Sequence, residues 1–310
     1  MQRGFEVADG VTAIDTMMAG RDRLTSAYLV ASPEPALIET GPGTSVETVT
    51  EALHSLGLGA GDLAHIIVSH IHLDHAGGAG EIARKFPSAS VWVHERGAQH
   101  LADPGRLLRS ATRTYGEDRM RLLFGEVVPV EAGRLRAVSG GERISLVGRY
   151  LTVLYTPGHA SHHVALQDSR TSAVFTGDAV GVHIPDLGIL RPASPPPEFD
   201  IELAVESIGK IQTHARDSLL FSHFGPVSAV DETCDLAVKR IRQWGEIVRV
   251  ALQHTDQLEQ VENALREATA EEYQGLDVSD AERFEILSGF RMNAAGLARY
   301  WKKRSESRSG

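Results

Sequence analysis

Short apolar runs separated by turn residues and amphipathic stretches dominate the first 230 residues of the chain. Short apolar runs between turn signals favour strands, whereas apolar residues that recur every three or four positions favour helices. The first 40 residues are expected to be mainly strands. Within the whole region we expect strands at residues 25–31, 36–40, 65–69, 90–94, 143–147, 150–155, 163–167, 173–176 and 218–221. Helices are expected at residues 44–56, 79–86, 98–125 and 201–214. This alternation predicts a layered α/β architecture.

A proline-rich stretch, Val180 to Asp200, lies between the last two predicted strands. A segment of this length without regular structure is uncommon inside a compact domain and is usually functional or disordered. We therefore expect an irregular functional loop here. Asp200 is expected to cap the helix that begins at Ile201.

The hydrophobic pattern changes after Pro226. Residues 232–270 contain no proline and repeat apolar residues at helical spacing, with a predicted break near Thr255. A capping box at Ser279–Glu282 predicts a last helix that carries an apolar stripe from Phe284 to Trp301. We therefore predict an α/β body over residues 1–230 and a C-terminal helical region over residues 231–310. The helical region could cover the site as a lid, pack against the body or form a homodimer contact.

Composition narrows the class of protein. The chain has 310 residues, a formal net charge of −10 and a single cysteine, Cys234. The negative balance argues against a nucleic-acid binder, which needs a basic face. One cysteine excludes an internal disulfide framework and a cysteine-rich zinc module. No apolar run approaches the ~20 residues of a membrane span, and the first ten residues lack the apolar core of a signal peptide, so we expect a cytoplasmic protein.

The segment His70–His75 reads His-x-His-x-Asp-His and follows a predicted strand. In extended backbone, alternate side chains share one side, so His70 and His72 can converge on one ion. A helix that begins near Asp74 would turn Asp74 and His75 toward a neighbouring position. Imidazole and carboxylate groups suit zinc, and also iron or manganese. The segment therefore predicts a metal site.

Three further polar residues follow predicted strands in the same way: His159, Asp178 and His223. Each lies one to four residues beyond an apolar run. Ligands presented from strand ends at one edge of a sheet system are typical of an α/β active site. We expect these residues to complete the metal site.

The motifs His-x-His-x-Asp-His, Gly-His, Gly-Asp and Ser-His, in this order, resemble those of the metallo-β-lactamase-fold superfamily over about residues 5–230. The resemblance implies an α/β fold of the four-layer αββα type, with a dinuclear metal site between two sheets and, here, a C-terminal helical extension. It also implies a ligand set for each ion: His70, His72 and His159 for the first, Asp74, His75 and His223 for the second, and Asp178 as the bridge between them.

Smaller features refine the resemblance. The spacing from Gly158-His159 to His163 resembles glyoxalase II and other thioester or lactone hydrolases, and residues 195–200 resemble an uncharacterised subgroup of this fold. Asp178 stands where zinc β-lactamases of the common class carry cysteine, which weakens an antibiotic-hydrolysing interpretation. Many relatives have Asp-Thr-Gly after the second strand, whereas this chain has Glu39-Thr40-Gly41.

The resemblance implies a metal-dependent hydrolase that acts on a small molecule. A hydroxide held by two divalent ions, most often Zn²⁺ and otherwise Fe or Mn, would cleave an ester-type bond in a lactone or thioester, and less readily a phosphodiester. Asp74 and Asp178 are the expected catalytic groups, either of which could pass on the proton. The main alternative is an iron-dependent oxidoreductase of the persulfide dioxygenase type on the same fold. A third alternative is a binding protein that has kept the fold.

Other histidines leave two interpretations open. His163 could orient a ligand or be an ordinary strand residue. His183 follows Asp178 in the chain and could line the pocket. His162 is expected to be structural or exposed.

Overall fold

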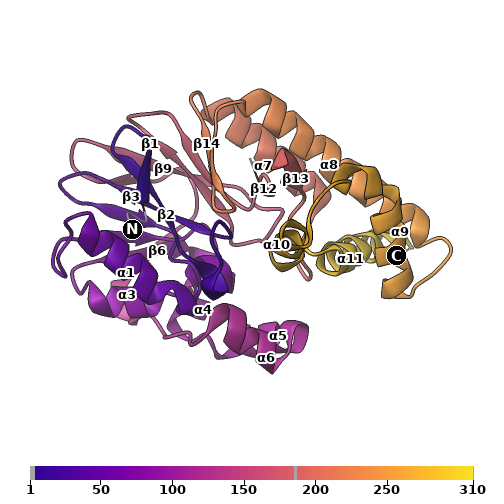
Figure 1. The fold of residues 1–310 in the computed structure, drawn as a ribbon, viewed down its shortest axis with the longest axis horizontal. Coiled ribbons are helices and arrows are strands. Elements are labelled where there is room, and N and C mark those ends of the chain that lie inside the picture. Colours follow the sequence, from indigo (N-terminus) through magenta and orange to yellow (C-terminus); the bar gives the residue numbers. More distant parts are fainter. Residues whose placement is uncertain (1–3, 185–186, 310) are drawn as a thin grey trace.

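The computed structural model describes residues 4–184 and 187–309, in which two sheets lie face to face between layers of helices (Figure 1). In spatial order, the first sheet contains β1 (Gly4–Ala8), β2 (Val11–Asp15), β3 (Ser26–Val30), β4 (Ala36–Ile38), β5 (His65–Ile67), β6 (Ser90–His94) and β7 (Leu135–Val138). The second sheet contains β15 (Gly225–Val227), β14 (Leu219–Phe221), β11 (Val174–Gly177), β10 (Val164–Asp168), β9 (Tyr150–Tyr155) and β8 (Arg143–Ser145). A separate hairpin pairs β12 (Val182–Ile184) with β13 (Ile189–Arg191).

The two sheets bury their facing side chains in one apolar layer. Tyr28 of β3 and Phe175 of β11 meet edge to face, with their ring centroids 5.3 Å apart. Ile38, Val153 and Leu220 fill the same layer and are almost fully buried. Such interdigitation fixes the distance between the sheets and therefore the positions of the strand ends.

Helices cover both outer faces, as Figure 1 shows. The first sheet packs against α1 (Val46–Ser55), α3 (Ala79–Lys85) and α4 (Glu95–Ala102). The second sheet packs against α7 (Ile201–His214) and, beyond it, α8 (Val230–Ala251). The expected four-layer αββα sandwich is confirmed.

The last part of the chain forms α9 (Leu258–Ala268), α10 (Val278–Ser288) and α11 (Phe290–Ser309). The C-terminal helical extension is confirmed. Its core is continuous with that of the second sheet, since Trp244, Leu265, Phe290 and Leu297 belong to the same buried cluster as Ile208 of α7. Trp244 and Phe290 stack with ring centroids 5.3 Å apart. The extension is therefore packed on the body. Its roles as a lid over the site or as a homodimer contact stay predictions.

Several local expectations need correction. The single last helix is two helices, because Ser288 and Gly289 are weak helix formers and Gly289 adopts extended backbone. The cap of α10 is Asp277, whose side chain accepts from the backbone N–H of Asp280, and not the Ser279 box. The helix expected from residue 44 begins at Val46, and the Thr44 hydroxyl donates to the Leu123 carbonyl.

The segment between residues 98 and 125 is also more broken than expected. It contains the end of α4, then α5 (Gly105–Tyr115), the short α6 (Glu117–Arg119) and a π-helical turn at Met120–Phe124. The stretch from 180 to 200 holds the β12–β13 hairpin and is not irregular throughout; residues 185–186 within it lie outside the described residues. Asp200 caps α7 as expected, accepting from the Leu203 N–H at 3.0 Å. In the described ranges, no helix combines the length and apolarity needed to cross a membrane.

Candidate metal centre

The sequence-predicted donors come together at one edge of the two sheets. His70 and His72 follow β5, while Asp74 and His75 lie on the short α2 (Leu73–Ala76). The remaining donors follow strands of the second sheet, namely His159 after β9, Asp178 after β11 and His223 after β14. They form three overlapping triplets, each with its ligand atoms within 4.8 Å of one another: His70–His72–His159, His70–His75–Asp178 and Asp74–His75–His223. The first and the last triplet share no residue, and we call them the first and the second donor group.

The first group aims three ring nitrogens at one point. Nε2 of His70 and Nε2 of His159 each lie 2.9 Å from Nδ1 of His72. The opposite nitrogens are engaged elsewhere: Nδ1 of His159 donates to the Ala193 carbonyl at 2.9 Å, and Nδ1 of His70 lies 2.9 Å from the Ser69 hydroxyl. In the neutral rings, the inward Nε2 atoms of His70 and His159 therefore carry lone pairs.

The second group is arranged in the same way around His75 and His223, whose Nε2 atoms lie 3.2 Å apart. Nδ1 of His223 donates to the Leu24 carbonyl at 3.0 Å, so Nε2 faces inward. Oδ2 of Asp74 lies 3.6 Å from the Nε2 atoms of both histidines.

Asp178 reaches both groups. Its Oδ1 lies 3.3 Å from Nε2 of both His75 and His223, and its Oδ2 lies 3.5 Å from Nε2 of His159. The carboxylate is almost completely buried. It is therefore placed where a bridging ligand between two cations would lie.

Electrostatics divides the imidazoles into two sets. Burial, together with the neighbouring imidazoles, holds the pKa of His70 and of His72 well below the usual value. Burial also disfavours charge on His75, but the carboxylates of Asp178, Asp74 and Glu39 outweigh it and raise the pKa of His75 well above its usual value. Burial opposes charge on Asp178 as well, yet the adjacent imidazoles, His75 foremost, hold its pKa well below the usual range. The neutral imidazoles of His70 and His72 beside the ionised Asp178 can donate to a cation directly, whereas His75 would release a proton on binding one.

A buried glutamate supports the donors from behind. Glu39 follows β4 and accepts hydrogen bonds at Oε1 from the Ser69 hydroxyl (2.5 Å), the Ser222 hydroxyl (3.1 Å) and Nδ1 of His75 (3.2 Å). Its Oε2 accepts from the Ser69 N–H at 3.2 Å. Such partners fix the tautomer and the orientation of a ligating imidazole. The sequence singled out Glu39 only as a departure from the usual Asp-Thr-Gly.

His163 supports Asp178. Its Nε2 accepts the Asp178 N–H at 3.0 Å, while its Nδ1 donates to the Thr156 hydroxyl at 2.8 Å. Gly177 makes this contact feasible, because its φ is +51° and a Cβ there would lie 2.4 Å from Nε2 of His163. Of the two interpretations left open for His163, the geometry favours the orienting role.

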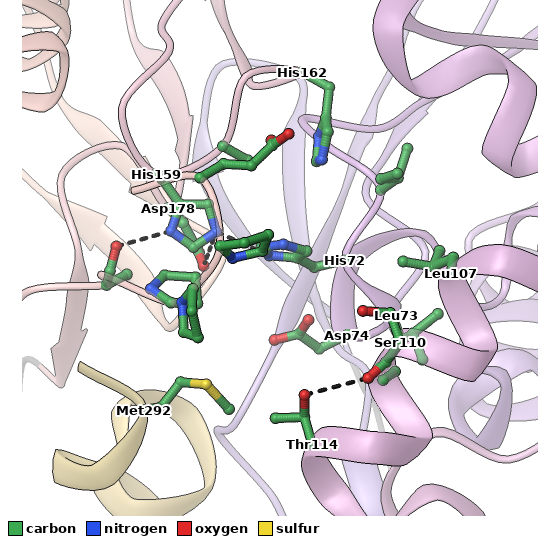
Figure 2. Close-up of a pocket in the computed structure, with 18 of the residues that line it drawn as sticks. His72, Leu73, Asp74, Leu107, Ser110, Thr114, His159, His162, Asp178 and Met292 are labelled. Atoms are coloured by element: carbon green, nitrogen blue, oxygen red, sulfur yellow. Dashed lines mark hydrogen bonds and ion pairs between the residues drawn. The ribbon is translucent and has the colours of Figure 1, made fainter. Parts of the chain in front are cut away.

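A cavity of about 490 Å³ opens onto the donors. His72, Asp74, His159 and Asp178 lie on its floor, and Figure 2 shows Met292 of α11 facing Thr114 of α5 across it. The same cavity is lined by residues that the sequence did not single out for it: Arg96, His100, Arg106, Ser110, Tyr115, Glu198, Leu287 and Asn293.

His162 and His183 differ in whether they reach the cavity. His162 lines the cavity, and its ring stacks over His70 with centroids 6.2 Å apart. Burial lowers the pKa of His162 to about 4. His183 lies on β12, outside the lining of this cavity, and its ring packs against Phe221.

The donor set fits divalent metal ions. Unshared lone pairs 2.9 Å apart repel unless a cation or a shared proton lies between them. Imidazole nitrogens with carboxylate oxygens are the ligands that zinc accepts, and iron or manganese accept them as well. His70, His72 and His159 would hold one ion, and Asp74, His75 and His223 would hold the other, with Asp178 between them.

Comparison with known proteins identifies the class. The family model of the metallo-beta-lactamase superfamily matches residues 20–223, and the chain belongs to that superfamily. A metallo-beta-lactamase fold-containing protein of Sulfurisphaera tokodaii is 29% identical over 170 residues, which cover 54% of this chain and 62% of that protein. A hydroxyacylglutathione hydrolase of Synechococcus is 30% identical over 49% of this chain and 48% of that enzyme.

Solved structures share the fold over nearly the whole chain. An archaeal metallo-beta-lactamase superfamily protein from Sulfolobus tokodaii aligns with a TM-score of 0.69 at 22% identity, covering 93% of this chain and 98% of that one. A metallo-beta-lactamase family protein from Thermus thermophilus aligns with a TM-score of 0.70 at 18% identity, and the alignment covers 96% of this chain and 95% of that one. The match to curated sequences is shorter, since the chain spans 62%, 39% and 41% of the lengths of the first three.

Proposed function

We propose that the protein is a metal-dependent hydrolase that cleaves an ester-type bond, in a lactone, thioester or related carboxylic ester. The observation that carries this proposal is the placement of Asp178 within 3.5 Å of imidazoles from both donor groups, on the floor of a cavity. Paired ions bridged by a carboxylate are suited to hydrolysis. A phosphodiester is the less favoured substrate.

Two divalent ions bound at this site would supply a nucleophilic hydroxide at neutral pH and polarise the scissile carbonyl. The residues of the chain provide the rest. Asp178 and the imidazoles hold the donor geometry. Of the seven donor residues, only His72 and Asp74 are partly exposed, and burial shields the other five from bulk water. Asp74 is the proton carrier, because its carboxylate is 22% exposed and faces the cavity (Figure 2). It would take the proton released on attack and return it to the leaving group.

The walls of the cavity suit an ester with an apolar part and an acidic group. Leu107, Leu287 and Met292 provide apolar surface. Arg96 and Arg106 line the same cavity, although the chain as a whole has a net charge of −10. Because guanidinium groups bind carboxylates and phosphates, they favour a substrate that carries negative charge. The partial likeness to a hydroxyacylglutathione hydrolase supports a thioester among the candidates.

Elemental analysis of protein purified without added metal tests the proposal. We expect about two zinc ions per chain, followed by turnover of at least one substrate from a panel of lactones, thioesters and phosphodiesters. One iron per chain with oxygen uptake on a persulfide would instead establish the sulfur-oxidising alternative. Two donor groups that share no residue, His70–His72–His159 and Asp74–His75–His223, favour the two-ion result. A chain that binds no ion would contradict both.

A further inference from the structure

The C-terminal helices contact a short segment that holds one of the candidate ligands. Residues 192–194 run between His159 on one side and α10 and α11 on the other. The Ala193 carbonyl accepts from Nδ1 of His159 at 2.9 Å. This contact sets which nitrogen of His159 faces the donor group.

Asn293 of α11 fixes that segment. Its Oδ1 accepts from the backbone N–H of Ser194 at 2.8 Å and from the Ser194 hydroxyl at 2.5 Å. Its Nδ2 donates to the Ser288 hydroxyl at 2.8 Å and to the Gly289 carbonyl at 3.1 Å. A backbone N–H can only donate, so the amide has one possible orientation. Asn293 is 1% exposed, and every polar group of its side chain is used.

Two other contacts hold the same segment from α10 and α11. The Ser288 hydroxyl donates to the Pro192 carbonyl at 2.6 Å. Gly296 lies so close to Ser194 that an added Cβ would be 1.8 Å from the Ser194 carbonyl oxygen. The helical extension therefore fixes the backbone on both sides of Ala193, at Pro192 and at Ser194.

Arg191, directly before this segment, is anchored as well. Its guanidinium lies over the rings of Tyr273, Phe284 and Phe290 at 4.2, 4.5 and 4.3 Å. The group is 97% buried, and it donates to the Ser288 carbonyl at 3.2 Å. Buried cation–π contacts of this kind favour a single arrangement of the extension relative to β13.

We propose that Asn293 is a positioning residue: through Ser194 and Ala193 it orients His159 and thereby completes the first group of donors. The inference rests on the proposed function, since it assigns His159 to a metal ion. It gives the C-terminal helices a role at the metal site rather than a role as packing alone.

The experiment compares Asn293→Ala with Thr269→Ala. Thr269 is equally buried in the same extension, but its hydroxyl donates to the Leu265 carbonyl at 2.8 Å and not to residues 192–194. Both variants lose a buried hydrogen-bonding side chain, so thermal unfolding of the metal-free proteins measures their common structural cost. Zinc is titrated into each protein against a competing chelator, which yields two binding constants.

We expect Asn293→Ala to weaken one of the two zinc-binding constants about tenfold and to leave the other within about twofold. Tenfold is the lower end of the loss in metal affinity that follows when a residue that orients a metal ligand is removed. Thr269→Ala should change neither constant. A merely structural role would not weaken one site selectively. The Co²⁺-loaded Asn293→Ala protein should also show an altered visible absorption spectrum, because the nitrogen geometry around one ion has changed.

Two results would overturn the inference, and they differ. If the wild-type chain binds two ions and Asn293→Ala matches Thr269→Ala, the inference alone is wrong. If the wild-type chain binds no ion, the proposed function is wrong and the inference falls with it. Gly296→Ala provides an independent test if Asn293→Ala fails to fold, because it displaces Ser194 while retaining the amide, and it should weaken the same constant.

Discussion

Glu39 and His75 are joined by a hydrogen bond of 3.2 Å between Oε1 and Nδ1, in the interior of the protein. The contact leaves Nε2 of His75 as the nitrogen that faces Asp178 and His223. The Glu39 carboxylate thus determines that Nε2 of His75, and not Nδ1, faces Asp178 and His223.

Replacing Glu39 with Gln tests this contact. One amide oxygen can still accept, but the NH₂ group must face either the Ser69 N–H or the cluster of donors at Oε1, so one set of donors loses its acceptor. We expect metal affinity to fall about 10- to 100-fold, as measured by competitive titration. Glu39→Asp is the matched control, because it keeps the carboxylate, and it should retain more of the affinity than Glu39→Gln. Equal affinities in the two variants would contradict the orienting role.

Asp178→Ala should abolish turnover while leaving the fold intact. The carboxylate is the group that reaches both sets of imidazoles, so its loss removes a shared ligand and the main negative charge among them. We expect metal content to fall below two ions per chain and the circular dichroism spectrum to be unchanged. The exposed Asp217, replaced in the same way, is the control. Wild-type rates in Asp178→Ala would refute the proposed mechanism.

Arg106→Gln should discriminate between charged and neutral substrates. Arg106 lines the cavity, whereas Arg109 lies on the same helix outside the lining; both residues are exposed. An exposed ion pair stabilises by at most about 1 kcal/mol, so we expect KM for a negatively charged ester to rise up to about fivefold in Arg106→Gln. KM for a neutral ester of the same size should stay constant in Arg106→Gln. In Arg109→Gln, KM should stay constant for both esters. The rise in KM for the charged ester should shrink at high salt. A uniform change for both esters would argue against charge recognition.

A buried ion pair away from the cavity predicts a pH dependence of stability. Arg149 donates to Asp168 through Nε at 2.6 Å and Nη2 at 2.7 Å, and both side chains are fully buried. Burial raises the pKa of Asp168, but hydrogen bonds from Arg149 and Thr171 outweigh it and hold the pKa below 3.8. A lowered folded pKa stabilises the native state above the unfolded value, and this contribution is lost as the pH falls through the folded value.

Asp168→Asn should therefore lower the free energy of unfolding at pH 7 by about 3 kcal/mol, since it leaves the Arg149 charge buried without its partner. The difference in free energy of unfolding between variant and wild type should begin to narrow below about pH 4, where the carboxyl of the unfolded chain takes up a proton, and should narrow further as the pH falls through the lower folded pKa. Urea unfolding at pH 7 and pH 3.5 measures both values. A gap that stays constant with pH would contradict the assignment of the charge to Asp168.

The sequence predicted the parts of the site that depend on short-range spacing. His70 to His75 are close in the chain, and strand ends carry the remaining donors, so the pattern alone indicated which residues would converge. The alternation of strands and helices indicated a layered α/β architecture, and the resemblance in motifs supplied the four-layer αββα arrangement. These features depend on local periodicity, which a single sequence records directly.

Contacts between distant segments were beyond that reasoning. Glu39 meets Ser69 because β4 lies beside β5, and Asn293 meets Ser194 across 99 residues of chain. Nothing in the immediate surroundings of Asn293 marks it, since an asparagine in a helix is usually on the surface. The hydrophobic pattern also did not predict the break at Gly289 between α10 and α11, because the apolar stripe continues from one helix into the next.

The distribution of donors over two sheets has a consequence for how the chain folds. Nε2 of His75 and Nε2 of His223 are 3.2 Å apart, yet the residues are separated by 148 positions. A nascent chain that has formed only its first half holds four donors and lacks the other three. A metal ion would therefore bind the finished tertiary structure far more tightly than any intermediate, and its binding energy would add to native-state stability. In a cell short of metal, the protein would then be less stable and more readily degraded, so that its abundance would follow the supply of the ion.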